Sequence, residues 1–191
     1  MYAVGINTST RKNGNTAQMI NMIFDVLKNN GIECKLIEMG DKVFSGCKGC
    51  NKCRETQDNK CINNSDQLND YIKEMVKADV IVLGSPTYFS NVTVNMKALI
   101  ERAGRVGFAN NMLFKYKIGA AVVPFRKAGG INAFTSINHF FLLSNMIVIG
   151  SNYWNVGQAG EKGEIKKDIE ATKNMKNLGN NIVWLLKKIK K

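Results

Sequence analysis

Long apolar runs are absent from the 191-residue sequence: none approaches the ~20 residues that a membrane-spanning helix needs. The first residues, MYAVGIN, also lack the charged segment, apolar segment and cleavage site of a signal peptide. We therefore expect a cytoplasmic protein with no membrane partner. Thiols stay reduced in that compartment, so clustered cysteines there bind metals or perform redox chemistry more often than they form disulfides.

Acidic residues are scarce: 15 stand against 27 basic residues, which gives a net charge of +12. Such a charge is typical of nucleic-acid-binding proteins, but no helix-turn-helix or RNA-binding signature is present. Four of the lysines lie in the segment LLKKIKK near the C-terminus, where a solvated helix end explains them. An anionic cofactor or an acidic electron-transfer partner would account for other basic residues. Nucleic acid is therefore not favoured as the main partner.

Histidine is almost absent. His139 lies in the apolar segment INHFFLL, where a helix residue with local hydrogen-bond partners is a better explanation than a catalyst. The sequence shows no arrangement of side chains for acid–base or nucleophilic catalysis, and we expect no catalytic residue.

Strand and helix patterns alternate along the chain. Short apolar or alternating segments predict five strands, at 2–7, 32–39, 79–85, 118–124 and 146–151. Apolar residues at helical spacing predict a helix after each strand, at 16–30, 65–78, 95–104, 131–145 and 162–190, with Ser65 as the N-cap of the second. This alternation, without repeats or a linker, predicts one α/β domain over 1–191, with a parallel sheet covered by helices on both faces.

Ligands of such sheets bind outside the carboxyl ends of the strands. The loop after the first strand, NTSTRKNGNT, offers small hydroxyl and amide side chains and opens a helix, as phosphate sites do. It contains neither the P-loop nor the G-x-G-x-x-G pattern, and an ordinary polar loop is the alternative.

Two later loops reach the same edge. Tyr88 and Phe89 would either line a flat ligand or cap the core. In PFRKAGG, Gly129 and Gly130 allow close approach of a ligand, and Arg126 and Lys127 supply positive charge. A glycine-rich turn before a helix is the alternative explanation of this segment.

Together these loops resemble the NADPH-dependent FMN reductase-like branch of the flavodoxin-like superfamily. The similar segments are STRKNGNT, GSPTYFSNVTVNMKALIER and RKAGGINAFTSINHFFLLSNMIVIG, and the resemblance extends from Tyr2 to about Gly150. It implies a flavodoxin-like three-layer sandwich with strand order 2-1-3-4-5, FMN as cofactor, a flavin-dependent oxidoreductase linked to NAD(P)H or ferredoxin, and a homodimer or homotetramer. Thr10 departs from the family pattern, in which proline is common.

The resemblance also implies three groups of FMN-binding residues. Those expected around the phosphate are Ser9, Thr10, Arg11, Asn13, Asn15 and Thr16. Those expected along the ribityl chain and the isoalloxazine are Pro86, Thr87, Tyr88, Phe89 and Asn91. Those expected against the ring, where a cation or N–H group would stabilise the reduced anion, are Arg126, Lys127, Ala128, Gly129 and Gly130.

Four of the five cysteines lie within SGCKGCNKCRETQDNKC, at a spacing of C-x2-C-x2-C-x7-C. Three thiolates at two-residue gaps can surround one corner of a cubane, and the fourth can close it from a flexible arm. Structural zinc sites more often use two separated pairs, but zinc and free redox thiols remain alternatives. The fifth cysteine, Cys34, lies at an apolar position of an alternating strand segment, and we expect it to be buried in the core.

This motif resembles the iron–sulfur flavoprotein family, although the gap before Cys61 is long for it. The resemblance implies a [4Fe–4S] cluster in an insertion at about 40–65, held beside FMN by Cys47, Cys50, Cys53 and Cys61. The implied function is electron transfer from a donor such as ferredoxin through the cluster to FMN, and on to a small-molecule or protein acceptor. The alternatives are a cluster-free NAD(P)H-dependent FMN or quinone oxidoreductase, and a basic FMN-binding regulator or nucleic-acid-binding protein.

Overall fold

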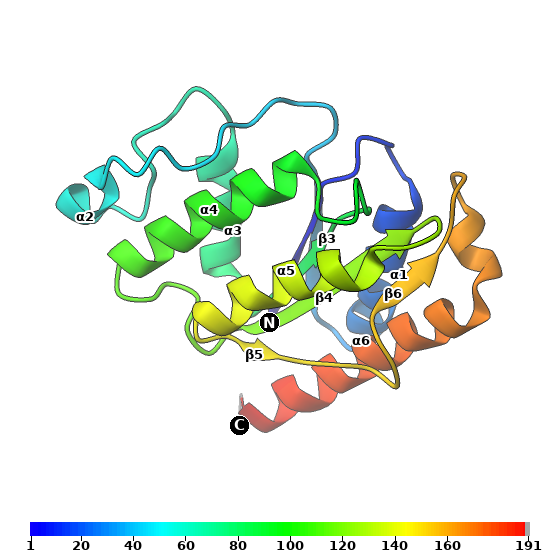
Figure 1. Ribbon diagram of the computed structural model, residues 1–191. Coiled ribbons are helices and arrows are strands. Elements are labelled where there is room, and N and C mark those ends of the chain that lie inside the picture. The colour runs from blue at the N-terminus through cyan, green and yellow to red at the C-terminus, as the bar shows by residue number, and fades with distance from the viewer. Residues whose placement is uncertain (190–191) are drawn as a thin grey trace.

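The computed structural model describes residues 1–189, which form a parallel sheet between two layers of helices (Figure 1). The strands are β1 (Tyr2–Asn7), β2 (Glu33–Glu38), β3 (Val80–Gly84), β4 (Ile118–Phe125), β5 (Ile147–Val148) and β6 (Val156–Gln158). Their order is β2-β1-β3-β4-β5, with β6 also paired to β4, and every pair is parallel. This order confirms the expected flavodoxin-like fold.

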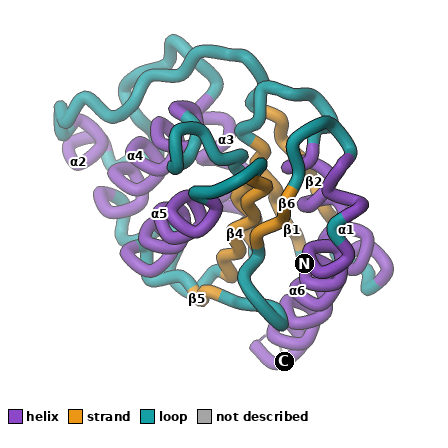
Figure 2. The backbone as a smooth tube through the Cα atoms, turned by 45° about the vertical axis from the view of Figure 1, so that its right-hand side comes forward, coloured by secondary structure: helices purple, strands orange, loops and turns teal. Residues whose placement is uncertain are grey.

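Helices cover both faces of the sheet (Figure 2). Their bounds are α1 (Asn15–Asn29), α2 (Lys52–Thr56), α3 (Leu68–Lys77), α4 (Val94–Ala109), α5 (Gly130–Leu143) and α6 (Ile169–Ile189), with a 3-10 turn, η1 (Glu164–Lys167), before α6. α1 and α6 pack on one face, and α3, α4 and α5 pack on the other. In the described part of the chain, no helix combines the length and apolar character needed to cross a bilayer.

The central strand β3 shows why the sequence takes this arrangement. Its five residues, VIVLG, are all buried, because alternate side chains enter the two different cores. Val80 and Val82 pack with α1 and α6, whereas Ile81 and Leu83 pack with the helices of the opposite face. A strand covered on both faces reads as a continuous apolar run.

The expected fifth strand, 146–151, is wrong in its extent. The edge beside β4 consists of two short pieces: β5 pairs with Ile118 and Gly119, and β6 pairs with Val123–Phe125. β6 has only three residues, too few to show an alternation of apolar and polar side chains. Gly157 within it lies so close to Ile165 that an added Cβ atom would overlap the Ile165 Cδ1 atom.

Three helix boundaries also differ from expectation. Ser65 does not cap α3: the helix begins at Leu68, whose N–H group is bound by the Asp66 carboxylate at 3.0 Å. α4 extends to Ala109, five residues beyond the predicted end at Gly104. The predicted last helix is a 3-10 turn followed by α6, and its final predicted residue, 190, lies outside the described residues.

Candidate functional site

A cavity of about 220 Å³ lies at the carboxyl ends of β1, β3 and β4. The structure brings eight of the predicted cofactor residues around it: Ser9, Arg11, Asn15, Thr16, Pro86, Thr87, Tyr88 and Arg126. Four further lining residues were not predicted: Pro124, Phe125, Ala159 and Gly160. The eight others do not line this cavity: Thr10, Asn13, Phe89, Asn91, Lys127, Ala128, Gly129 and Gly130.

The loop after β1 is folded by its own polar groups. The Ser9 N–H group donates to Asn7 Oδ1 at 2.9 Å, and the Ser9 hydroxyl accepts the Arg11 N–H group at 3.2 Å. The loop leads directly into α1, whose first-turn N–H groups have no intrahelical acceptor and carry the positive end of the helix dipole. The first turn contains no acidic residue, and Arg11 lines the cavity. This end of the cavity therefore suits a phosphate group.

Asn15 holds a second loop against the first. Its Nδ2 atom donates to the Glu161 carbonyl at 2.8 Å, and its Oδ1 atom accepts N–H groups from Gly163 at 2.9 Å and Ile165 at 3.3 Å. Arg11 Nη1 adds a bond to the Gly160 carbonyl at 2.8 Å. Both polar atoms of the Asn15 side chain are thus used within the protein, so Asn15 supports the cavity wall.

A buried hydroxyl network joins the first loop to α4. The Thr93 hydroxyl donates to the Thr8 hydroxyl at 2.8 Å, and the Thr8 hydroxyl donates in turn to the Gly84 carbonyl at 3.2 Å. The Thr93 N–H group donates to the Ser85 hydroxyl at 3.0 Å. Thr93 also caps α4 through Met96. The sequence did not point to Thr8 or Thr93, because no local pattern indicates that the loop after β1 contacts the start of α4.

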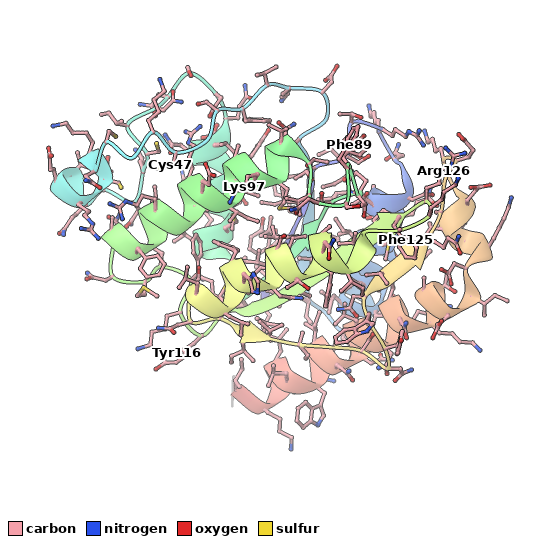
Figure 3. The ribbon with its side chains drawn as sticks, viewed as in Figure 1. Cys47, Phe89, Lys97, Tyr116, Phe125 and Arg126 are labelled. Atoms are coloured by element: carbon pink, nitrogen blue, oxygen red, sulfur yellow. The ribbon has the colours of Figure 1, made fainter. Side chains whose placement is uncertain are left out.

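The turn from Tyr88 to Asn91 forms one lip of the cavity. Each of these two residues donates its N–H group to the other's carbonyl, at 2.9 and 3.0 Å. Phe89 and Ser90 both have positive φ angles, 45° and 62°, as in a type I′ turn. Phe89 is fully exposed at the tip, on the same side of the molecule as Arg126 in Figure 3.

The 126–130 loop closes against this turn because Gly129 has no side chain. A Cβ atom on Gly129 would lie 2.6 Å from Ser90 Cα, and its φ of +83° also favours glycine. The Thr10 hydroxyl lies 3.3 Å from the Tyr88 hydroxyl. The three predicted loops therefore contact one another around a single opening.

The four predicted cysteine ligands line a second, smaller cavity with a free volume of about 40 Å³. The segment that carries them leaves the sheet edge after β2 and runs along α4, with α2 beside that helix (Figure 1). Cys53 is buried and its thiol lies 3.9 Å from the Arg105 carbonyl, whereas Cys50 is exposed. The Cys47 N–H group is held by Glu101 at 3.2 Å and the Cys61 N–H group by Asn69 at 2.9 Å.

Burial raises the pKa of the Cys53 thiol, with Arg105 acting in the opposite direction and Cys47 and Cys61 adding to the increase. The mutual influence of these thiols reflects their proximity. Among residues 1–189, however, no three Cys, His, Asp or Glu side chains converge closely enough to hold one metal ion. A single zinc ion needs four ligand atoms about 2.3 Å from one centre. In a cubane each thiolate binds a different iron, so the sulfurs lie further apart.

The cysteine cavity is lined in part by α4, whereas no α4 residue lines the cavity at the strand ends. The cysteine cavity contacts Arg105, about 17 Å further along the helix axis than Val94 at the usual rise per residue. Two adjoining cavities of about 490 and 580 Å³ lie between α4 and α5, from Asn91 to Cys47. They share Lys97, which Figure 3 shows on α4. The loop that carries the cysteines therefore starts at the sheet edge and extends away from it along α4 (Figure 1).

Comparisons with known proteins agree with this architecture. Residues 1–161 match the family model described as NADPH-dependent FMN reductase. An iron–sulfur flavoprotein of Methanocaldococcus jannaschii is 34% identical over 200 aligned residues, covering 100% of each chain. An iron–sulfur flavoprotein of Methanosarcina thermophila is 31% identical over 154 residues, covering 80% of this chain and 78% of that protein.

Solved structures show the same fold at low sequence identity. RosB superimposes with a TM-score of 0.74 at 14% identity, covering 100% of this chain and 80% of that chain. An archaeal flavodoxin superimposes with a TM-score of 0.64 at 18% identity, covering 98% and 99% of the two chains.

Proposed function

The chain belongs to the NADPH-dependent FMN reductase family, alongside proteins named iron–sulfur flavoproteins, and is a flavin-dependent oxidoreductase; we propose that it transfers electrons between a [4Fe–4S] cluster and FMN. The observation that carries the proposal is that all four cysteines of the C-x2-C-x2-C-x7-C motif line one cavity. That cavity lies beside α4, whose N-cap, Thr93, is hydrogen-bonded to Thr8 in the loop that leads to the strand-end pocket, the cavity at the carboxyl ends of β1, β3 and β4.

The strand-end pocket suits FMN in its polar groups. The first turn of α1, with Ser9, Arg11 and Thr16, would hold the phosphate. Thr87 Oγ1 is buried and has no hydrogen-bond partner among the described residues. Since Thr87 lines the pocket, this hydroxyl is available to a polar group of the ribityl chain. Tyr88 and Arg126 stand at the opening, where they would face the isoalloxazine ring.

When bound, FMN supplies two-electron and one-electron chemistry and the cluster supplies one-electron chemistry. The chain's own residues bind and orient these groups. The positive charge of Arg126 would favour the reduced, more negative flavin. No side chain is assigned as an acid or base.

The cysteine cavity suits an iron–sulfur cluster by its donor set. Four thiols surround it, and Lys48 and Arg105 on its wall offset the negative charge of thiolate ligands.

We propose ferredoxin or NAD(P)H as the electron donor, and a small molecule or another protein as the acceptor. The proposed assembly is a homodimer or homotetramer. The full exposure of Phe89 at the lip of the pocket supports it, because a second subunit would cover this ring.

The decisive experiment is anaerobic purification followed by assays of iron, acid-labile sulfide, zinc and FMN. About four irons and four sulfides per FMN are expected. Cys50→Ser should lower both iron and sulfide. Cys34→Ser is the matched control, because Cys34 lies in β2 outside the cysteine cavity. FMN with neither iron nor sulfide after anaerobic reconstitution would remove the cluster from the proposal.

A cluster-free NAD(P)H-dependent FMN or quinone oxidoreductase is the second candidate. Its support is that, in the part of the chain that the structure describes, no cysteine lines the strand-end pocket. In that case NAD(P)H would reduce bound FMN at the same rate in the wild type and in Cys50→Ser, and the zinc assay would show what the thiols bind.

A further inference from the structure

Arg102 is a buried cation on the wall of the cysteine cavity. It is 1% exposed, although its position on α4 lies within a surface helix. Its Nη1 atom donates to both Asp66 carboxylate oxygens, at 2.7 and 2.6 Å, and its Nη2 atom donates to the Asn63 carbonyl at 2.7 Å. Asp66 neutralises the charge, and the two sets of bonds fix the plane of the guanidinium group.

The third nitrogen of this guanidinium group is unsatisfied. Arg102 Nε is buried and has no hydrogen-bond acceptor among the described residues. An unpaired buried donor costs free energy, so native proteins rarely keep one without a role. The polar atoms that share this cavity wall include four thiol sulfurs. Arg102 lines the same cavity as these thiols, so the group that the thiols bind is a candidate for the missing acceptor.

We propose that the Arg102 Nε–H group donates a hydrogen bond to a sulfur atom of the iron–sulfur cluster and raises the cluster's reduction potential. This inference rests on the proposed function, since it requires the cluster. Reduction adds negative charge to the cluster, and an N–H donor beside a sulfur stabilises that charge. Arg102 would contact the cluster through this hydrogen bond and would not bind iron.

The other arginine of the cavity wall is less suited to this role. Arg105 is only partly buried and its Nη2 atom is bound to Asn51, so solvent screens its charge. The direction of the Arg102 Nε–H bond is fixed before any cluster enters, because Asp66 and Asn63 hold the side chain. A fixed donor in a buried site needs no reorganisation when the charge of the cluster changes.

The test is Arg102→Lys in the anaerobically reconstituted protein. Lysine keeps the positive charge and can still pair with Asp66, but it has no N–H group at the Nε position. We expect unchanged iron and sulfide per chain and a lower reduction potential. At the midpoint potential of the wild type, the ratio of reduced to oxidised cluster should fall about tenfold, which is ~59 mV for a one-electron couple. Arg54→Lys is the control, because Arg54 is exposed and does not line the cavity.

A second measurement needs no variant. In wild-type protein grown with 15N-arginine, pulsed electron paramagnetic resonance of the reduced cluster should detect coupling to an arginine nitrogen. Absence of this coupling, or a wild-type potential in an Arg102→Lys protein that holds its full cluster, would overturn the inference. A wild type that binds neither iron nor sulfide would instead overturn the proposed function, so the two failures are distinguishable.

Discussion

Asn15 in α1 accepts a hydrogen bond from the Gly163 N–H group at 2.9 Å across 148 residues of sequence. Through this bond the first loop and the loop after β6 form one wall of the strand-end pocket. The wall also includes Ala159 and Gly160. Its geometry therefore depends on an amide side chain that contacts only protein groups.

Replacing Asn15 with alanine should weaken FMN binding. The change removes all three of its hydrogen bonds to the 161–165 loop, and the loop would no longer be fixed against α1. We expect the Kd of the apoprotein for FMN to rise about tenfold, or ~1.4 kcal/mol, measured by quenching of flavin fluorescence. Asn29→Ala is the control, because Asn29 is exposed at the other end of α1. An unchanged Kd would show that Asn15 has no part in shaping the pocket.

Gly129→Ala should disturb the opposite wall. The new Cβ atom would be strained by the φ of +83° and would overlap Ser90, so the 126–130 loop must move away from the Tyr88 turn. We expect a loss of about 1–3 kcal/mol in the free energy of unfolding, together with weaker FMN binding.

Gly31→Ala separates the two causes. Gly31 also has a positive φ, +74°, but an added Cβ atom there meets no atom of residues 1–189 within 4 Å. The Gly31→Ala variant should therefore lose stability through backbone strain alone and keep the FMN affinity of the wild type. Equal FMN affinities in the two variants would contradict the role given to the contact between Gly129 and Ser90.

The sequence was sufficient to predict most of the sheet and the identity of the strand-end loops. β3 and β4 are long enough, and buried enough on both faces, to read as apolar runs. β6 could not be predicted, because its three residues gain their strand conformation only by pairing with β4. The missed pocket residues Ala159 and Gly160 follow β6 and were missed for the same reason. Pro124 ends a predicted strand and Phe125 follows it directly, so both could have been found.

The environment of Arg102 also could not be predicted. Its segment, NMKALIER, has the pattern of a surface helix. Arg102 is buried because a loop from before α3 folds over α4 and brings Asp66 to it. No local signal marks that long-range pairing, which closes the cysteine segment onto the helix.

The pair of Arg102 and Asp66 should be essential for stability. Arg102→Met leaves the Asp66 carboxylate, whose side chain is 8% exposed, without its partner. We expect a loss of about 3–5 kcal/mol in the free energy of unfolding, measured by urea denaturation of the apoprotein. The double variant Arg102→Met, Asp66→Asn should recover much of this loss. The exposed pair of Lys52 and Glu55 is the control, and Lys52→Met should cost less than about 1 kcal/mol.

Tyr2→Phe should destabilise the protein in a pH-dependent manner. The Tyr2 hydroxyl donates to Glu74 Oε2 at 2.6 Å, and this bond is the main cause that lowers the pKa of Glu74, with Lys35 and Lys77 adding to it. A lowered pKa in the folded state stabilises the protein above the unfolded pKa of about 4.3. This stabilisation is lost as the pH falls through the folded value.

We therefore expect Tyr2→Phe to cost about 1 kcal/mol at pH 7, and the difference from the wild type to shrink steadily below about pH 4.3. Urea denaturation at several pH values measures both effects. Tyr116→Phe is the control, because Tyr116 is 68% exposed and should show no such trend. A Tyr2→Phe deficit that stayed constant down to pH 3 would mean that the hydroxyl contributes through packing, and that its bond to the ionised carboxylate is not the source of the stabilisation.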